Sequence, residues 1–226
     1  HENEIAQSEA ATGKPYAKAW LHCGMITING EKMSKSLGNF FTIREVLEKY
    51  HPEVVRYLLI ASHYRSPINY SEDNLRESKA ALERFYNALK GLPEAEPAAA
   101  DEFVARFSAA MDDDFNTASA CSVLFELARE VNRLRDSDLQ AAAALAARLK
   151  SLAALLGVLQ LEPEAFLQAD AAGRVDAAAV EALIEARLAA RAAKDWAASD
   201  QIRDQLSAMG VLLEDAKGVT TWRLAD

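Results

Sequence analysis

Residues 20–39 read WLHCGMITINGEKMSKSLGN and contain the clearest structural signal in the chain. An apolar run that ends at Ile28 is followed by Asn29-Gly30 and by a second extended run from Glu31. An Asn-Gly pair between extended runs favours a two-residue hairpin turn, because both residues tolerate positive φ. We therefore predict a β-hairpin that leads directly into a polar loop.

That polar loop combines two lysines and two hydroxyls in one five-residue string, Lys32-Met33-Ser34-Lys35-Ser36. The lysines would supply mobile positive charge for a triphosphate, while the hydroxyls and loop amides would supply hydrogen-bond donors. A lysine in such a place lowers the barrier only if it binds departing pyrophosphate better than ground-state ATP. The string therefore indicates a phosphate-binding loop, although an arbitrary pair of lysines would more often mark a solvated surface.

Helical signals dominate the residues after this loop. Thr42 and Glu45 have the spacing of a capping box, and Pro52 suits the first turn of a second helix. Ser71 opens a long helix, and residues 63–70 before it are expected to form a loop. Further helices are expected near residues 101–111, 116–135, 138–157, 177–193 and 195–208.

Composition along the chain indicates three parts. Residues 94–100 are an Ala/Glu/Pro linker inside the helical region, and a closing hairpin is expected between residues 211 and 224. We predict a mainly α chain, with the hairpin and polar loop in residues 1–70. A helical bundle would occupy residues 71–172, and a small α/β module would occupy residues 173–226.

Overall composition limits the class of protein. The 226 residues are half apolar, with two cysteines and no apolar run of the roughly 18–20 residues that a membrane helix needs. No basic-then-apolar signal segment opens the chain, so we expect a cytoplasmic protein without a disulfide framework. Because the first residue is His1 rather than Met, we also expect that a preceding part is missing.

The formal net charge of −9 at first argues against a nucleic-acid partner. The acidity lies in the middle, however. Residues 71–172 carry 10 Lys/Arg and 18 Asp/Glu, whereas residues 1–70 carry 8 and 7, and residues 173–226 carry 7 and 9. Either end can therefore present a local basic face to RNA.

The five-residue string at 32–36 is the KMSKS signature of class I aminoacyl-tRNA synthetases, and its surroundings are similar to one family in that class. Residues 1–8, HENEIAQS, resemble the HHENEIAQS segment of cysteinyl-tRNA synthetases, entered at its second histidine. Stretches that resemble the same family in order are residues 20–24, 39–42, 64–66, 69–71, 112–117 and 194–196. The likeness covers essentially the whole chain. KMSKS alone would indicate only class I, whereas HENEIAQS indicates the cysteine family.

This resemblance implies the end of a Rossmann-type catalytic domain, then a tRNA-binding bundle and an anticodon-recognition module. The enzyme would bind ATP with Mg²⁺, form cysteinyl-adenylate and transfer cysteine to tRNA-Cys, as a monomer. By the resemblance Lys35 is the catalytic lysine that contacts ATP and Lys32 assists it, in an ATP site that also includes Met33, Ser34 and Ser36. The first class I signature, of the His-Ile-Gly-His type, has no counterpart in the sequence, so this chain alone is not expected to activate cysteine.

The resemblance also implies one zinc ion, held in the family by two cysteines, a histidine and a glutamate. A thiolate on zinc separates cysteine from serine, which packing around one small atom could not do. Glu4 matches the glutamate ligand, and the other three ligands are expected outside this chain. Cys23 and Cys121 are instead expected to be small core residues, and His22 fits a structural role as well as a place near the adenylate.

The run Asp112-Asp113-Asp114 suggests a metal site at first sight. Consecutive carboxylates do not easily converge on one ion, and the run comes directly before Asn116-Thr117 and a new helix. We therefore expect these carboxylates to cap that helix and to interact favourably with its dipole.

Charged residues surround Trp196 where the last two predicted helices meet. The tryptophan would offer a stacking surface for an unpaired base, while arginine and aspartate would contact phosphates and base edges. Periodicity alone favours a helical hairpin with a core tryptophan and solvated charges. The resemblance changes this interpretation, because the residues with which the family meets the GCA anticodon match Arg191, Trp196, Asp200, Arg203 and Asp215.

Two other functions stay open at this point. One is an ATP-dependent ligase that joins cysteine to an amino-sugar, which would share KMSKS and the zinc-site glutamate but would need no anticodon reader. The other is a non-enzymatic tRNA-binding module, in which the KMSKS loop would be idle.

Overall fold

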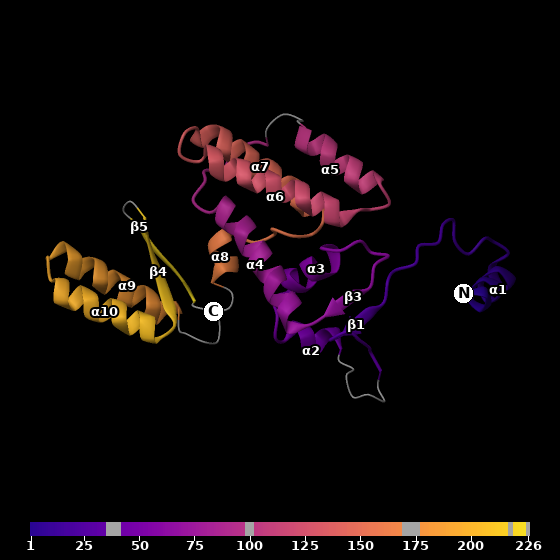
Figure 1. The fold of residues 1–226 in the computed structure, drawn as a ribbon, viewed down its shortest axis with the longest axis horizontal. Coiled ribbons are helices and arrows are strands. Elements are labelled where there is room, and N and C mark those ends of the chain that lie inside the picture. The colour runs from indigo at the N-terminus through magenta and orange to yellow at the C-terminus, as the bar shows by residue number, and fades with distance from the viewer. Residues whose placement is uncertain (35–41, 98–101, 169–176, 217–218, 225–226) are drawn as a thin grey trace.

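The computed structural model describes residues 1–34, 42–97, 102–168, 177–216 and 219–224. The molecule is mainly helical, as predicted, and elongated (Figure 1). Helix α1 (Glu2–Thr12) lies at one end, a helical bundle lies in the middle, and a module of two helices and a hairpin lies at the other end. No helix in these ranges is both long and apolar enough to cross a membrane.

A small sheet contains the predicted hairpin. Its order is β2-β1-β3, from β1 (Ile26–Ile28), β2 (Glu31–Lys32) and β3 (Ile68–Tyr70). Asn29 and Gly30 have φ of 49° and 83°, which confirms the turn between β1 and β2. The prediction of a loop over residues 63–70 is wrong at its end, where β3 pairs in parallel with β1. A three-residue strand is too short to show a periodic pattern, and its partner is distant in sequence.

Two short helices follow the hairpin, and both begin as predicted. Before α2 (Ile43–Leu47), the Thr42 hydroxyl accepts from the Glu45 amide at 3.3 Å, and Glu45 Oε2 accepts from the Thr42 amide at 2.6 Å. This reciprocal pair is a capping box. Helix α3 (Pro52–Ile60) has proline in its first turn, where a missing N–H removes no intrahelical hydrogen bond.

The bundle contains four longer helices and one short one. They are α4 (Glu72–Leu89), α5 (Glu102–Asp112), α6 (Thr117–Leu134), α7 (Leu139–Leu155) and α8 (Pro163–Leu167). Helix α6 packs against α5 and α7, while α4 packs against α3, α6 and α8. Helix α8 was not predicted, because five residues are too few to show helical periodicity.

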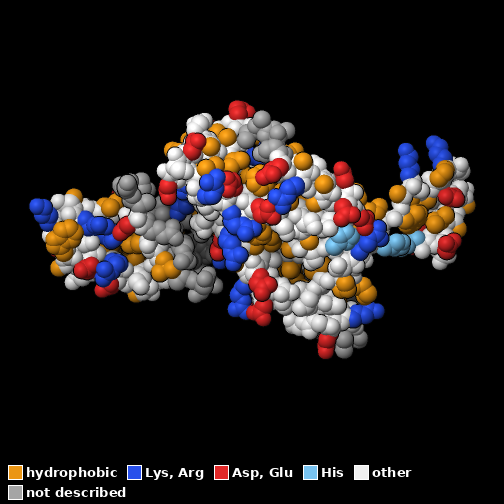
Figure 2. All heavy atoms as spheres, turned by 45° about the horizontal axis from the view of Figure 1, so that its top comes forward, with side chains coloured by type: hydrophobic (Ala, Val, Ile, Leu, Met, Phe, Trp, Pro, Cys, Tyr) orange, Lys and Arg blue, Asp and Glu red, His pale blue; other side chains and the backbone are white. Residues whose placement is uncertain are grey.

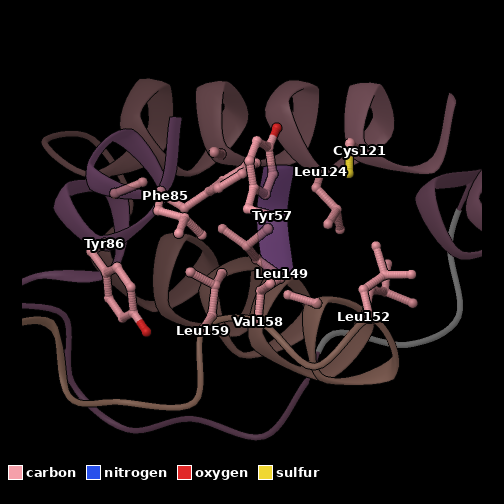
Figure 3. Close-up of a cluster of buried hydrophobic side chains, with 14 of the residues drawn as sticks. Tyr57, Phe85, Tyr86, Cys121, Leu124, Leu149, Leu152, Val158 and Leu159 are labelled. Atoms are coloured by element: carbon pink, nitrogen blue, oxygen red, sulfur yellow. The ribbon is translucent and has the colours of Figure 1, made fainter. Parts of the chain in front are cut away.

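The apolar faces of these helices meet in one core. Figure 3 shows Tyr57 of α3, Phe85 of α4, Leu124 of α6 and Leu149 of α7 pointing toward one another. Cys121 is buried in this core, as predicted, and burial raises the pKa of its thiol to about 11. Because Tyr57 belongs to α3, the core joins the segment after the KMSKS string to the bundle.

A buried carboxylate adds a polar connection inside this core. Glu53 is 6% exposed, and its Oε2 accepts from the Tyr86 hydroxyl at 2.8 Å and from the Leu159 amide at 3.1 Å. Its Oε1 accepts from the Gln160 amide at 2.8 Å. One side chain of α3 therefore fixes α4 and the segment after α7. Burial, followed by the hydrogen bond to Glu53, raises the pKa of Tyr86.

The last part of the chain has its own small core. Helices α9 (Ala177–Ala192) and α10 (Trp196–Ala208) pack together, and the predicted hairpin of β4 (Val211–Ala216) and β5 (Val219–Leu224) follows them (Figure 1). Gly210, between α10 and β4, has φ of 75°, as a glycine after a helix end should. The core side chains are Val180, Ile184, Leu206, Val211 and Trp222.

The structure corrects the role predicted for the three aspartates. Asn116 caps α6, since its side chain accepts from the Ser119 amide at 3.1 Å, while Asp112 ends α5. Asp114 has φ of 52° and turns its carboxylate toward Arg65. The capping prediction is wrong because this partner lies 49 residues away, where local sequence gives no sign of it.

Candidate functional site

The KMSKS hairpin, defined here as residues 26–34, places the first three residues of the signature string at the edge of the small sheet. Lys32 is the last residue of β2 and pairs with Thr27 of β1, and Met33 and Ser34 follow as half-buried residues. Lys35 and Ser36, the other two predicted members of the ATP site, lie outside the described residues. The described part of the predicted site therefore ends at Ser34.

Asn69 of β3 fixes the turn of this hairpin. Its Oδ1 accepts from the Gly30 amide at 2.8 Å and from the Thr27 hydroxyl at 3.3 Å. Its backbone carbonyl accepts from Asn74 Nδ2 at 2.8 Å, in the first turn of α4. The hairpin is thus attached through one asparagine to α4, the first helix of the bundle. Sequence reasoning missed Asn69, because its contacts to the hairpin span about forty residues.

A second connection joins the segment before β1 to the bundle. The Gly24 amide donates to the Tyr64 carbonyl at 2.7 Å, and the Tyr64 hydroxyl donates to Asp114 Oδ1 at 2.7 Å. Arg65 donates Nε to Asp114 Oδ2 at 2.6 Å and Nη2 to Oδ1 at 3.2 Å. A Cβ atom on Gly24 would lie 2.1 Å from the Ser66 carbonyl oxygen, so glycine is required for this close approach.

The electrostatics of this second connection favour an ionised Asp114. Hydrogen bonds from Arg65 and then from Tyr64 lower the pKa of the Asp114 carboxyl to about 2. His63 Nε2 lies 3.8 Å from Asp114 Oδ2, so a protonated His63 would add a further positive charge. One carboxylate therefore joins two segments that are distant in sequence, the one between α3 and β3 and the turn between α5 and α6.

The described residues do not fit a complete zinc site. Glu4 is exposed on α1, and the His1 ring lies 5.9 Å from that of His22 and 5.4 Å from that of Trp20. Within the described ranges, no three His, Cys, Asp or Glu side chains come together as metal ligands. A structural or catalytic zinc site needs at least three protein ligands, so no chemical step is assigned to zinc.

Cys23 is also not the core residue that was predicted. Its side chain is exposed in the extended segment before β1, where the apolar residues Trp20, Leu21 and Met25 are exposed as well. The apolar run therefore predicted burial for residues that are exposed in the described structure.

The C-terminal module places two of the five predicted anticodon residues in one cluster. Asp215 of β4 accepts at Oδ2 from Arg191 Nη1, at 3.1 Å. The same carboxylate accepts from both terminal nitrogens of Arg187, at 3.0 and 2.9 Å, and from the Thr220 hydroxyl at 2.7 Å. Hydrogen bonds from Arg187 and then Thr220 hold the pKa of Asp215 far below its ordinary value. Sequence reasoning missed Arg187, although its four-residue spacing from Arg191 puts both on one helix face.

The other two charged residues of the prediction form a neighbouring pair. Arg203 Nη1 lies 3.1 Å from Asp200 Oδ1, on the exposed side of α10. The hydrogen bonds to Asp215 raise the pKa of Arg187, and the charge of Asp200 adds to this effect. Asp200 is therefore close enough to Arg187 for their charges to interact. Figure 2 shows blue and red side chains interspersed at this end of the molecule.

The two tryptophans of the module have opposite environments. Trp196, the first residue of α10, is 60% exposed, whereas Trp222 is 3% exposed and donates Nε1 to Glu181 Oε1 at 2.7 Å. Periodicity alone favoured a core tryptophan at position 196, and the structure shows that Trp222 fills the core instead. An exposed indole offers a flat surface on which an unpaired base can stack.

Comparison with known protein families gives three consecutive matches. Residues 1–80 match the class I (C) tRNA synthetase catalytic domain, and residues 106–160 match the DALR domain. Residues 177–223, which include α9, α10 and the closing hairpin, match the anticodon-binding domain of cysteinyl-tRNA ligase.

Curated relatives agree along the whole chain. Proteins named cysteine–tRNA ligase are 88% identical to it in Pseudomonas aeruginosa and 80% identical in Stutzerimonas stutzeri and in Azotobacter vinelandii. Each match covers all 226 residues of this chain and 49% of the relative. The chain thus spans about half the length of the curated relatives it matches, and by these matches it belongs to the cysteinyl-tRNA synthetase family.

Proposed function

We propose that this chain supplies the KMSKS loop and the tRNA-binding parts of a cysteine–tRNA ligase, which activates cysteine with ATP and transfers it to tRNA-Cys. The observation that carries this proposal is the exposed Trp196 in a module that matches an anticodon-binding domain. An amino-sugar ligase would have no use for that module. We propose further that the enzyme acts as a monomer in the cytoplasm.

In this proposal the ATP site lies at the end of the KMSKS hairpin. Lys35 contacts the triphosphate and Lys32 assists it, with Met33, Ser34 and Ser36 completing the loop. This proposal is supported by the position of the string directly after the hairpin. The hydrogen bonds from Gly30 and Thr27 to Asn69 hold the turn of that hairpin in place. A fixed base matters because a catalytic lysine must meet the charge that develops as pyrophosphate departs.

In this proposal the three parts of the chain have different roles in tRNA recognition. Residues 1–70 would form the end of the catalytic domain and contact the tRNA stem, and residues 71–172 would space the active site from the anticodon. Residues 173–226 would read the anticodon through Arg191, Trp196, Asp200, Arg203 and Asp215. Separate cores in the bundle and in the module support the boundary between the last two parts, whereas α3 of the first part shares the core of the bundle. Glu4 is proposed as a zinc ligand in the enzyme, completed by ligands beyond the residues described.

Binding of the chain to tRNA-Cys transcripts tests the proposal. Transcripts with the GCA anticodon and with single-base changes are compared at one salt concentration, since salt alone alters affinity strongly. Loss of one base–indole stack costs roughly 1–3 kcal/mol, so Trp196→Ala should weaken GCA binding by roughly 5- to 150-fold. Trp20→Ala is the matched control for anticodon preference, because Trp20 is also exposed but lies in the N-terminal segment, so the ratio of affinities for GCA and changed anticodons should stay as in wild type. Equal binding to every transcript would refute the anticodon assignment.

A further inference from the structure

One residue of the Asp215 cluster is too buried to reach RNA, yet it has the most contacts with the carboxylate. Arg187 is 8% exposed, whereas the side chains of Asp215 and Arg191 are 44% and 43% exposed. Both terminal nitrogens of Arg187 donate, Nη1 to Oδ1 at 3.0 Å and Nη2 to Oδ2 at 2.9 Å. Such a parallel fork fixes the plane of a carboxylate as well as its position.

We propose that Arg187 is a positioning residue for anticodon recognition, which holds Asp215 from the buried side so that the outward side of its carboxylate is presented to RNA. The inference rests on the proposed function of the module. Arg187 itself touches no base in this proposal and acts only through Asp215 and Arg191.

The contacts of the carboxylate suit an exchange of partners. An ionised carboxylate accepts about four hydrogen bonds, and Arg187 occupies one position on each oxygen. The other two positions accept from the Thr220 hydroxyl at 2.7 Å and from Arg191 at 3.1 Å. An exocyclic amine of a base can replace one of these outward donors, while Arg187 keeps the carboxylate in its orientation. The chemical class recognised is thus an amino-bearing base, and all three bases of GCA carry such an amine.

The environment of Arg187 indicates that this arrangement serves Asp215 rather than local stability. Its Nε is buried and has no hydrogen-bond partner within the described part of the chain. A buried polar atom without a partner is destabilising, and apolar side chains often replace buried ion pairs without loss of stability. The arginine therefore fits a role in orientation better than a role in holding α9 to β4.

Removal of Arg187 has a specific consequence for the two exposed residues. Asp215 would then be able to rotate and form the two-pronged pair with Arg191, which lies on the same helix face. That pair would engage both side chains with each other, so neither would present its polar atoms to a base. The affinity for the GCA anticodon should fall toward the affinity for changed anticodons.

The experiment measures discrimination by the full 226-residue chain. The readout is the ratio of dissociation constants for tRNA-Cys transcripts with one changed anticodon base and with GCA. Partial unfolding weakens binding to both transcripts by the same factor, so a purely structural role would not move this ratio. We expect Arg187→Met to reduce the ratio roughly tenfold, equivalent to about 1.4 kcal/mol.

Two further variants and one control complete the design. Arg187→Lys keeps the charge but offers no planar fork, so it should restore only part of the ratio. In the Asp215→Asn background, Arg187→Met should cause no further loss, because Arg187 acts through Asp215. Glu181→Gln is the matched control, since it weakens the bond to Trp222 in the same module without touching Asp215.

The outcomes separate this inference from the proposed function. A wild-type ratio near one refutes anticodon reading itself, whatever Arg187 does. A large wild-type ratio that both Arg187 variants retain overturns the positioning role and leaves the proposed function intact. If Arg187→Met loses the circular dichroism of the module helices, the folded Arg187→Lys variant decides, and an unchanged ratio there overturns the inference.

Discussion

Replacement of Glu53 by alanine should destabilise the bundle by about 3–5 kcal/mol. The change removes the acceptor for the Tyr86 hydroxyl and for the amides of Leu159 and Gln160. Each buried donor left without a partner costs roughly 1–3 kcal/mol, and the three losses are coupled because they share one side chain. A small domain has only about 5–15 kcal/mol of stability in total, so this loss would be large.

Two milder variants of this network test the reasoning. In Glu53→Gln the amide oxygen can still accept at one position, but the NH₂ group can't accept at the other, so the loss should be about 1–2 kcal/mol. Tyr86→Phe leaves both backbone donors bound to Glu53, and its loss should also be about 1–2 kcal/mol.

The measurement is urea unfolding followed by far-UV circular dichroism. Tryptophan fluorescence reports the module separately once Trp20 is replaced by phenylalanine in all proteins compared, because the remaining tryptophans, Trp196 and Trp222, both belong to the module. The fluorescence transition from the module should therefore stay unchanged in all three variants. A Glu53→Ala protein within about 0.5 kcal/mol of wild type would refute the argument, since such a value is typical of an ordinary surface substitution.

Three further predictions concern the second connection and the cysteines. The pKa of Asp114 is lower when folded, about 2, than in an unfolded chain, about 3.9, so its stabilising effect is present above about pH 4. The unfolding difference between wild type and Asp114→Asn should therefore be constant above about pH 5 and vanish as pH falls toward 2. Gly24→Ala should lower stability by about 1–3 kcal/mol and speed amide exchange in the hairpin, whereas Gly13→Ala, which meets open space, should leave that exchange unchanged. A thiol reagent should label exposed Cys23 in the native chain and buried Cys121 only after unfolding.

Each of these predictions has a result that contradicts it. A pH-independent difference for Asp114→Asn would mean that the Arg65 pair does not form in solution. Slow hairpin exchange in Gly24→Ala would show that the chain accommodates a Cβ beside Ser66, and native labelling of both thiols would show that Cys121 is accessible.

Local signals in the sequence predicted most of the fold. The capping box of Thr42, the first-turn Pro52 and the Asn29-Gly30 turn each depend on neighbours a few residues away, so propensity alone places them. Strand β3 and helix α8 escaped prediction because elements of three and five residues show no period. Such short elements exist only because distant parts of the chain pack against them.

The residues of the candidate site also fall into two groups, those that the sequence identifies and those that only the fold identifies. The KMSKS string and the tryptophan of α10 are readable from sequence and family likeness. The contacts of Asn69, of Arg65 with Asp114 and of Arg187 with Asp215 join residues 28 to 49 positions apart, which only the fold brings together. Cys23 illustrates the reverse error, in which an apolar sequence context suggested burial that the described structure does not provide.

The central claim is that the module around Trp196 reads the anticodon of tRNA-Cys. Nuclease footprinting of a tRNA-Cys transcript with the full chain tests this most directly. We expect protection of the anticodon loop by wild type, loss of that protection in Trp196→Ala, and unchanged protection in Trp20→Ala. Protection spread evenly over the tRNA, or an anticodon loop as exposed as in free tRNA, would contradict the account.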